Sequence, residues 1–140
     1  MYNFFLHLHS GLRWLVLLVA IVVVLKSLVG LFGGSKYSKF DSIIAPAYVG
    51  LMDLQLLAGL ILYFFLSPFT SDFSFNMSDD VIRFWAVEHL ALMLFAVVAA
   101  HVGRSISKKT DDAQVKFRFQ SIFFGMSLIL MLMGIPWERM

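Results

Sequence analysis

Four apolar runs dominate the sequence, and each is long enough to cross a lipid bilayer. They cover residues 4–32, 42–66, 81–103 and 117–135. A transmembrane helix needs about 20 predominantly apolar residues, because a helix rises only about 1.5 Å per residue. The short loops between consecutive runs make neighbouring helices antiparallel. The sequence therefore predicts an all-α integral membrane protein, a four-helix up-and-down bundle that forms one transmembrane domain over residues 1–140.

The composition agrees with a membrane protein and excludes other classes. Hydrophobic residues make up 60% of the chain and charged residues 14%, whereas soluble domains have about 45–50% and about 25%. The basic residues cluster in short loops and not on one face of a soluble fold, which excludes nucleic-acid binding. Because the chain has no cysteine, disulfides, thiolate metal sites and covalently attached c-type haem are excluded.

The distribution of charge predicts how the bundle is oriented in the membrane. The middle loop carries Asp72, Asp79 and Asp80 but no Lys or Arg. Cytoplasmic loops of membrane proteins carry an excess of Lys and Arg. We therefore expect a bacterial inner-membrane protein with both termini on the outer (periplasmic) side and its first and third loops in the cytoplasm. Eight of the 11 basic residues lie at those two loops: Lys26, Lys36, Lys39, Arg104, Lys108, Lys109, Lys116 and Arg118.

Ionisable residues gather at the outer ends of the first and third helices. His7, His9 and Arg13 lie near the start of the first run, and Glu88 and His89 lie about two turns into the third. Ionisable side chains are costly inside a membrane, so they mark a candidate functional site. Because both helices start on the outer side in the predicted topology, we expect these groups to lie at similar depth.

Helical phase separates the two N-terminal histidines. At about 100° per residue, His7 and His9 point roughly 200° apart, so a regular helix cannot direct both into one site. His9 shares a face with Arg13 and, further along, Ser27, in a row of small or polar residues typical of a bundle interior. His7 shares a face with Gly11, which could leave room for a flat ring. The phase favours His9 over His7 as the inward residue.

Two histidines from different transmembrane helices can hold a b-type haem as axial ligands. We therefore predict His9 and His89 as iron ligands, with His7 as the alternative to His9. Arg13 or Arg83 could pair with a propionate, because arginine binds carboxylates bidentately. A cofactor-free interpretation also stands, in which Arg13 and Glu88 form a buried ion pair that neutralises both.

Two further ionisable residues lie deeper in the predicted helices. Asp53 is about 15 Å from the cytoplasmic start of the second helix, where a carboxylate is protonated, paired or part of a proton path. Its structural alternative is a hydrogen bond to a serine of another helix (Ser27, Ser121 or Ser127). Gln55, on the opposite face, shares a row with Gly59 that indicates a helix-packing seam. His101 lies near the cytoplasmic end of the third helix, where it could cap the helix or join Asp53 in a proton or polar relay.

The motifs His7-x-His9-Ser10-Gly11-Leu12-Arg13-Trp14, Glu88-His89 and His101-x-Gly103-Arg104 resemble those of small four-helix bacterial membrane proteins, the cytochrome b-like proteins of the CopD and cytochrome b561 type. The resemblance covers most of the chain. It implies that His7 or His9, together with His89, ligates a haem. Histidine pairs 13 or 14 residues apart on one helix, typical of two-haem proteins in such families, are missing here, which implies one haem at most.

Three functions follow as hypotheses from these residues. The first is a haem b protein in electron transfer, alone or as part of an oxidoreductase complex. The second is a haem-free accessory subunit of a larger membrane complex. The third is a small proton- or quinone-linked transport module that uses Asp53 and Arg13. Beyond the lipid bilayer, the expected partners are other membrane subunits or further copies of the chain. The sequence has no hydrolase or transferase motif. Whether the protein is an enzyme, for example as part of an oxidoreductase complex, stays open.

Overall fold

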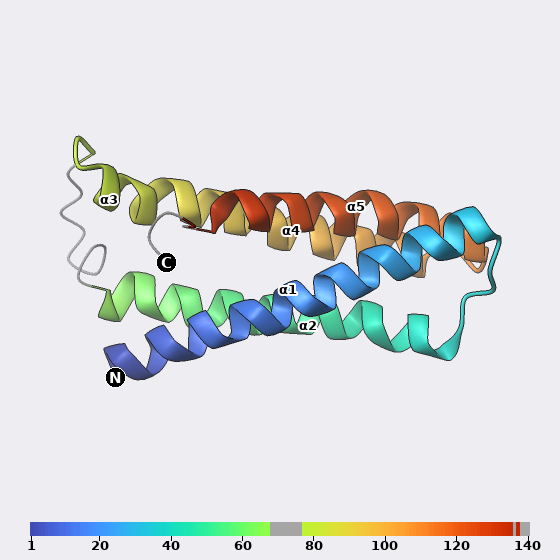
Figure 1. The fold of residues 1–140 in the computed structure, drawn as a ribbon, viewed down its shortest axis with the longest axis horizontal. Helices are drawn as coiled ribbons and strands as arrows, with labels where there is room; N and C mark the ends of the chain where they lie inside the picture. Colours follow the sequence, from blue (N-terminus) through green and yellow to red (C-terminus); the bar gives the residue numbers. More distant parts are fainter. Residues whose placement is uncertain (68–76, 136, 138–140) are drawn as a thin grey trace.

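The computed structural model describes residues 1–67, 77–135 and 137, and within these ranges the chain is a bundle of long helices (Figure 1). The long helices are α1 (Tyr2–Gly33), α2 (Lys39–Ile61), α4 (His89–Lys108) and α5 (Ala113–Gly134). A π-helical turn, η1 (Leu62–Leu66), extends α2, and a short helix α3 (Asp80–Arg83) and a second π turn η2 (Phe84–Glu88) lead into α4. Counted with these extensions, four helices are long and apolar enough to cross a membrane. The predicted all-α membrane fold is confirmed at this level.

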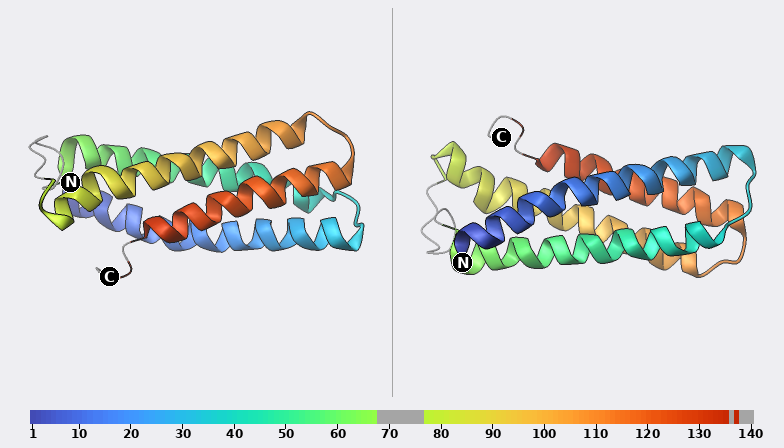
Figure 2. Two further views of the ribbon diagram at one scale, coloured as in Figure 1. Left: turned by 90° about the horizontal axis from the view of Figure 1, so that it is seen from above. Right: turned by 60° about the horizontal axis from the view of Figure 1, so that its bottom comes forward.

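The helices form a square in cross-section. α1 packs against α2 and α5, and α4 packs against the same two helices. α1 and α4 therefore lie diagonally across the bundle, and their inward side chains meet in its interior. The views in Figure 2 show that α1 begins and α5 ends toward the same end of the bundle.

Short polar signals set the ends of the helices. α1 ends at Gly34, whose φ of 63° is the left-handed conformation that glycine adopts most readily. α2 begins with a capping box, in which the Ser38 hydroxyl accepts from the Asp41 backbone N–H and the Asp41 carboxylate accepts from the Ser38 backbone N–H. The side chains of Asp79 and Asp112 cap α3 and α5 in the same role by accepting backbone N–H groups of the first turn.

At the basic end of the bundle, the ends of two helices differ from the sequence prediction. α4 continues to Lys108 instead of ending at residue 103, and α5 begins at Ala113 instead of 117. Arginine and lysine are good helix formers, so the basic segment extends α4 although it is not apolar. The N-cap at Asp112 then starts α5 four residues early. The loop expected over residues 104–116 shrinks to 109–112, and His101 lies two turns inside α4.

The core contains small and apolar side chains together with a buried hydrogen-bonded chain. The Ser127 hydroxyl donates to the Ala96 carbonyl oxygen at 2.8 Å and lies 2.6 Å from the Tyr48 hydroxyl. Because the single Ser127 hydrogen is used by Ala96, the Tyr48 hydroxyl donates to Ser127. This chain ties α2, α4 and α5 together. Large apolar side chains cover the outside of the bundle, as expected for contact with lipid.

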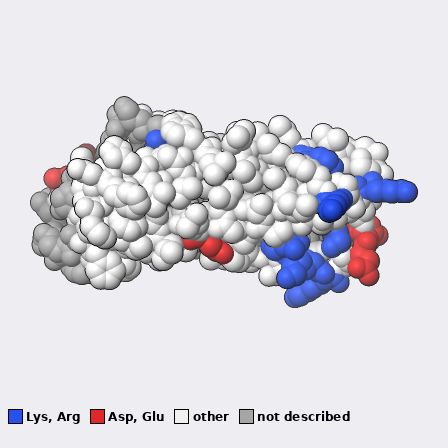
Figure 3. Space-filling model, turned by 90° about the horizontal axis from the view of Figure 1, so that it is seen from below, with Lys and Arg blue, Asp and Glu red and all other residues white. Residues whose placement is uncertain are grey.

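A polar cluster closes the bundle at its basic end, where Figure 3 shows Lys and Arg gathered. Lys26 forms an ion pair with the buried Asp41 at 3.0 Å. In the loop between α1 and α2, the Tyr37 hydroxyl accepts from Gln120 Nε2 at 2.6 Å, and Gln120 Oε1 accepts from the Ser27 hydroxyl. Burial raises the pKa of the Tyr37 phenol, which keeps the hydroxyl protonated as a donor.

Candidate functional site

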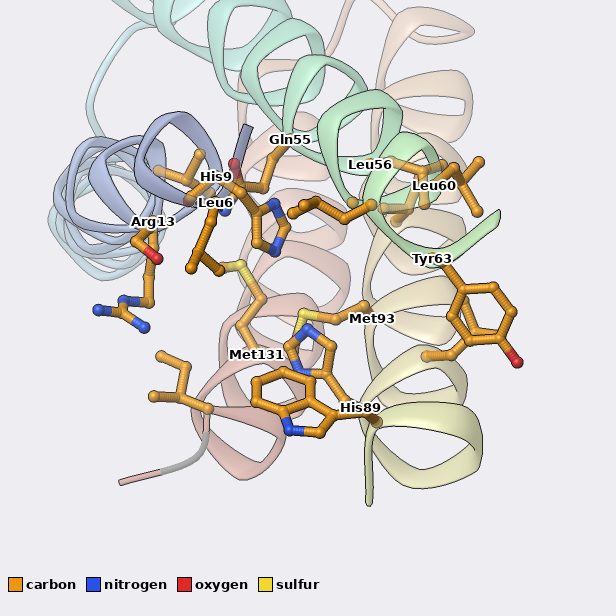
Figure 4. A pocket seen from close by; sticks show the side chains of 18 of the residues that line it. Leu6, His9, Arg13, Gln55, Leu56, Leu60, Tyr63, His89, Met93 and Met131 are labelled. Carbon is orange, nitrogen blue, oxygen red and sulfur yellow. Dashed lines mark hydrogen bonds between the residues drawn. The ribbon is translucent and has the colours of Figure 1, made fainter. Parts of the chain in front are cut away.

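A pocket lies inside the bundle at the end opposite the basic cluster (Figure 4). Its cavity volume is about 180 Å³, and side chains of α1, α2, α4 and α5 line it, together with residues of the two π turns. Most of the lining is leucine, methionine and aromatic side chains. The nitrogen-bearing side chains in the lining, Trp85 apart, are His9, Arg13, Gln55 and His89.

Contacts from α2 place the His9 ring. Gln55 Nε2 donates to the His9 carbonyl oxygen at 2.7 Å, which holds α1 against α2 at this depth. The imidazole then lies over Gly59, where a Cβ atom would stand only 3.1 Å from His9 Cε1. Glycine therefore makes the space that the ring occupies. His9 Nδ1 is buried and has no hydrogen-bond partner within the described ranges.

The His89 ring is held by the end of α5 and by aromatic neighbours. His89 Nδ1 lies 2.8 Å from the carbonyl oxygen of Gly134. A carbonyl only accepts, so Nδ1 carries the hydrogen and Nε2 keeps its lone pair. The indole of Trp85 packs edge-on against the ring, with centroids 5.1 Å apart. Histidines that bind metals commonly donate their second nitrogen to such a carbonyl.

The two imidazoles face each other across the diagonal of the bundle (Figure 4). The ring centroids of His9 and His89 are 6.2 Å apart, and the ring planes meet at 82°. Two imidazoles on opposite sides of one metal have centroids about 6 Å apart, because each metal–nitrogen bond is about 2 Å and each ring centre lies about 1 Å beyond its nitrogen. The spacing of the two rings is compatible with a metal bound between them, and it also lies within the range of about 4.5–7 Å for ordinary edge-to-face aromatic packing.

The two imidazoles of His9 and His89 suit a metal that already has other ligands. In the described part of the chain, no group of three or more His, Asp or Glu side chains could hold a metal ion. Two imidazoles are too few for a closed zinc site, which needs four protein ligands. They are the number that haem iron takes from a protein when the porphyrin supplies the other four nitrogens. The residues present thus fit a haem better than a bare ion.

The π turn before α4 changes the direction in which the Glu88 side chain points, so Glu88 does not lie where a regular α-helix would place it. In a π turn, residues five apart stack along the helix, whereas residues four apart stack in an α-helix. Arg83 Nε accordingly lies 3.3 Å from Glu88 Oε1, and both side chains are exposed. The turn is braced by Tyr63, whose hydroxyl donates to the Ala86 carbonyl oxygen at 2.9 Å. Glu88 is absent from the pocket lining.

The other predicted residues of the N-terminal motif divide between the pocket and the surface. Arg13 lines the pocket, its guanidinium carbon lies 4.8 Å from the Trp14 ring centroid, and its buried Nε has no hydrogen-bond partner among the described residues. The buried Arg13–Glu88 ion pair of the cofactor-free interpretation does not form, because Glu88 bonds Arg83 instead. His7 is exposed, as helical phase predicts.

Asp53 and His101 meet each other away from the pocket. His101 Nε2 lies 2.7 Å from Asp53 Oδ1. The structural alternative for Asp53, a hydrogen bond to a serine of another helix, is not found among the described residues. Ser27 bonds Val23 and Gln120 instead, and Ser127 bonds Tyr48 and Ala96. Because α4 continues to Lys108, His101 lies about two turns inside the helix and not at its end, and there it contacts Asp53 of α2.

The chain matches no protein-family model, no curated protein and no solved structure. The similarity to cytochrome b-like proteins therefore stays a prediction that rests on short motifs. Residues that the sequence did not assign to the site are Gln55, Gly59 and Gly134. Gln55 and Gly59 share the row that indicated a packing seam, but nothing in that row says which side chain of α1 it receives.

Proposed function

We propose that this protein binds one b-type haem between α1 and α4 and transfers electrons through it. The His9–His89 pair carries the proposal: the rings face each other at the spacing of two axial ligands, and the Gly134 carbonyl fixes the tautomer of His89. When bound, haem supplies one-electron redox chemistry. The protein's part is to hold the two imidazoles, exclude water with apolar side chains and set the surrounding charge.

Arg13 is the residue best placed to bind a propionate. It lies one turn below His9 in α1 and borders the same pocket, and its buried Nε has an unused hydrogen. Arginine pairs with carboxylates through parallel hydrogen bonds. Such a pair would neutralise a cation that otherwise faces an apolar cavity. Arg83 is less suited, because Asp80 and Glu88 already occupy its guanidinium.

A porphyrin needs more room than the cavity of about 180 Å³ provides, since pockets for larger ligands measure about 300–1,000 Å³. The lining includes Met52, Met93 and Met131. Methionine is unbranched and repacks easily, so we propose that these side chains move aside when the ring enters between the imidazoles.

The proposed orientation places the haem near the outer face of a bacterial inner membrane. Basic residues gather at the end opposite the pocket (Figure 3), and basic segments of membrane proteins favour the cytoplasm. Both termini and the pocket then lie toward the periplasm. The redox partner would dock at that side, either as a soluble carrier or as another subunit of a membrane complex.

Absorption spectroscopy on protein purified from haem-replete cells tests the proposal. We expect a red protein with about one haem b per chain, a Soret band that shifts on reduction, and iron as the bound metal. Arg13→Gln should keep the haem but change its reduction potential, because a charge next to a propionate is lost. Colourless protein, or copper bound to the histidines and methionines of the pocket, would contradict the proposal.

A further inference from the structure

A second polar pair lies on the outside of the bundle, where lipid is expected. Asp53 of α2 and His101 of α4 are hydrogen-bonded at 2.7 Å, and both side chains are 49% exposed. On the face that Figure 3 draws, acidic atoms also appear between the two ends of the bundle. Asp53 is the acidic residue at mid-length of α2. The pair belongs to neither the pocket nor the basic end.

Both residues of the pair lie inside helices that are long and apolar enough to cross a membrane. Asp53 is about 20 Å from either end of its membrane-spanning helix, and His101 is about 10 Å from the end of α4. Toward the pocket end, the exposed residues one turn away are apolar, Leu57 on α2 and Val98 on α4, whereas toward the basic end of α4 the polar Ser105 is exposed and Arg104 is half-exposed. An ionisable pair that faces hydrocarbon is costly unless its remaining hydrogen bonds are satisfied.

The internal hydrogen bond uses only half of what the two side chains offer. Asp53 Oδ2 and His101 Nδ1 take part in no hydrogen bond to any described residue. A protonated imidazole donates from both nitrogens, and a carboxylate accepts on both oxygens. Each Asp53–His101 pair therefore has one donor and one acceptor left over. The donor of one such pair can bind the acceptor of a second pair, and the reverse.

We propose that Asp53 and His101 form the centre of an interface between two copies of this chain. With a two-fold axis along the membrane normal, α2 of one copy faces α4 of the other at the same depth. The free Nδ1–H of His101 in each copy then donates to the free Asp53 oxygen of the other. The four side chains then close a ring of hydrogen bonds in which the two histidines and the two aspartates satisfy one another.

The surface around the pair allows this approach. Gly50 lies one turn from Asp53 on the exposed side of α2, and a Cβ atom added there would meet nothing within 4 Å. Small residues let helices of different subunits come close in a membrane. Leu57 and Val98 are 57% and 56% exposed and supply apolar contacts beside the ring. The interface does not depend on any cofactor in the pocket.

Cross-linking of engineered cysteines in native membranes tests the interface, and the chain has no cysteine of its own. Two differently tagged copies are co-expressed, one with Leu57→Cys and the other with Val98→Cys. The matched control pair is Leu18→Cys with Ile129→Cys, on α1 and α5, which are 59% and 60% exposed. We expect oxidation to link the first pair into heterotagged dimers and to leave the control pair monomeric.

Substitution of the pair itself provides the second measurement. Asp53→Asn or His101→Asn should lower cross-linking by roughly tenfold, because a partner is lost from the ring. The exchange Asp53→His with His101→Asp should restore it, since the same four groups face one another. Equal cross-linking of both cysteine pairs, no loss with Asp53→Asn, or links only to a different membrane protein would each overturn the proposal. The wild-type cross-link does not depend on whether these variants fold.

Discussion

The imidazole of His9 rests directly over Gly59, so close that a Cβ atom at position 59 would lie 3.1 Å from His9 Cε1. α2 therefore leaves room for the ring by lacking a side chain at this one position. The Gln55 amide, one turn away, holds the His9 carbonyl. Together these contacts direct His9 toward His89 before any ligand binds, which is what a preorganised ligand pair requires.

Gly59→Val should lower haem binding without unfolding the bundle. A branched side chain would push the His9 ring toward the cavity centre and disturb its spacing from His89. We expect at least about a tenfold fall in haem affinity, in the range seen when groups that orient a metal ligand are lost. Haem titration followed by absorbance measures this change. Gly125→Val is the control, since a Cβ atom there meets nothing within 4 Å; equal losses in both variants would argue against a positioning role for Gly59.

Replacing each histidine by alanine distinguishes the histidines that bind the haem iron from those that do not. His9→Ala and His89→Ala should each abolish the low-spin haem spectrum, because one axial ligand is lost. His7→Ala and His101→Ala should keep it, since His7 is exposed and His101 bonds Asp53. Circular dichroism of each variant checks that the helices are intact. A spectrum that survives His89→Ala, or disappears with His7→Ala, would reassign the ligands.

The angle between the two rings predicts a spectroscopic signature. The planes of His9 and His89 meet at 82°. Perpendicular axial imidazoles leave two iron d orbitals nearly equal in energy, and the ferric low-spin EPR signal is then strongly anisotropic. Parallel rings would give a well-resolved rhombic signal instead. Low-temperature EPR of the oxidised protein distinguishes the two cases, and a rhombic signal would show that the rings rotate when haem binds.

The sequence predicted the fold because membrane-spanning helices are recognised by their length and hydrophobicity. It also predicted which side of α1 faces the interior, because that helix is regular. Its errors have physical causes. The fall in hydropathy after residue 103 predicts that the third helix ends there, but in the structure Arg104 and Lys108 continue the helix. The π turns at η1 and η2 leave no periodic signal, so the Arg83–Glu88 pair was missed. The sequence grouped Asp53 and His101 as one possible polar relay, but their direct hydrogen bond on the outside of the bundle depends on the relative rotation of α2 and α4, which a single sequence does not contain.

Gly103→Ala should destabilise the packing of α4 on α5. A Cβ atom at position 103 would lie 2.7 Å from Phe123 Cβ, and this neighbour cannot swing aside because it is the first atom of its side chain. Overpacking of this kind costs about 1–3 kcal/mol. Thermal unfolding in detergent should show a lower midpoint than the wild type. Gly125→Ala, on the same bundle but in open space, should leave the midpoint nearly unchanged or raise it slightly.

The chain of hydroxyls through Tyr48 and Ser127 should respond unequally to the loss of its two members. In Tyr48→Phe, Ser127 still donates to the Ala96 carbonyl oxygen, so only one neutral hydrogen bond is lost, worth about 0.5–1.5 kcal/mol. In Ser127→Ala, the fully buried Tyr48 hydroxyl loses its acceptor, and the cost of about 1–3 kcal/mol is that of an unsatisfied polar group. The double variant should be less destabilised than the sum of the two, because removing both partners leaves no orphaned hydroxyl. Unfolding free energies of the three variants measure this order; a Tyr48→Phe variant less stable than Ser127→Ala would reverse the assigned direction of donation.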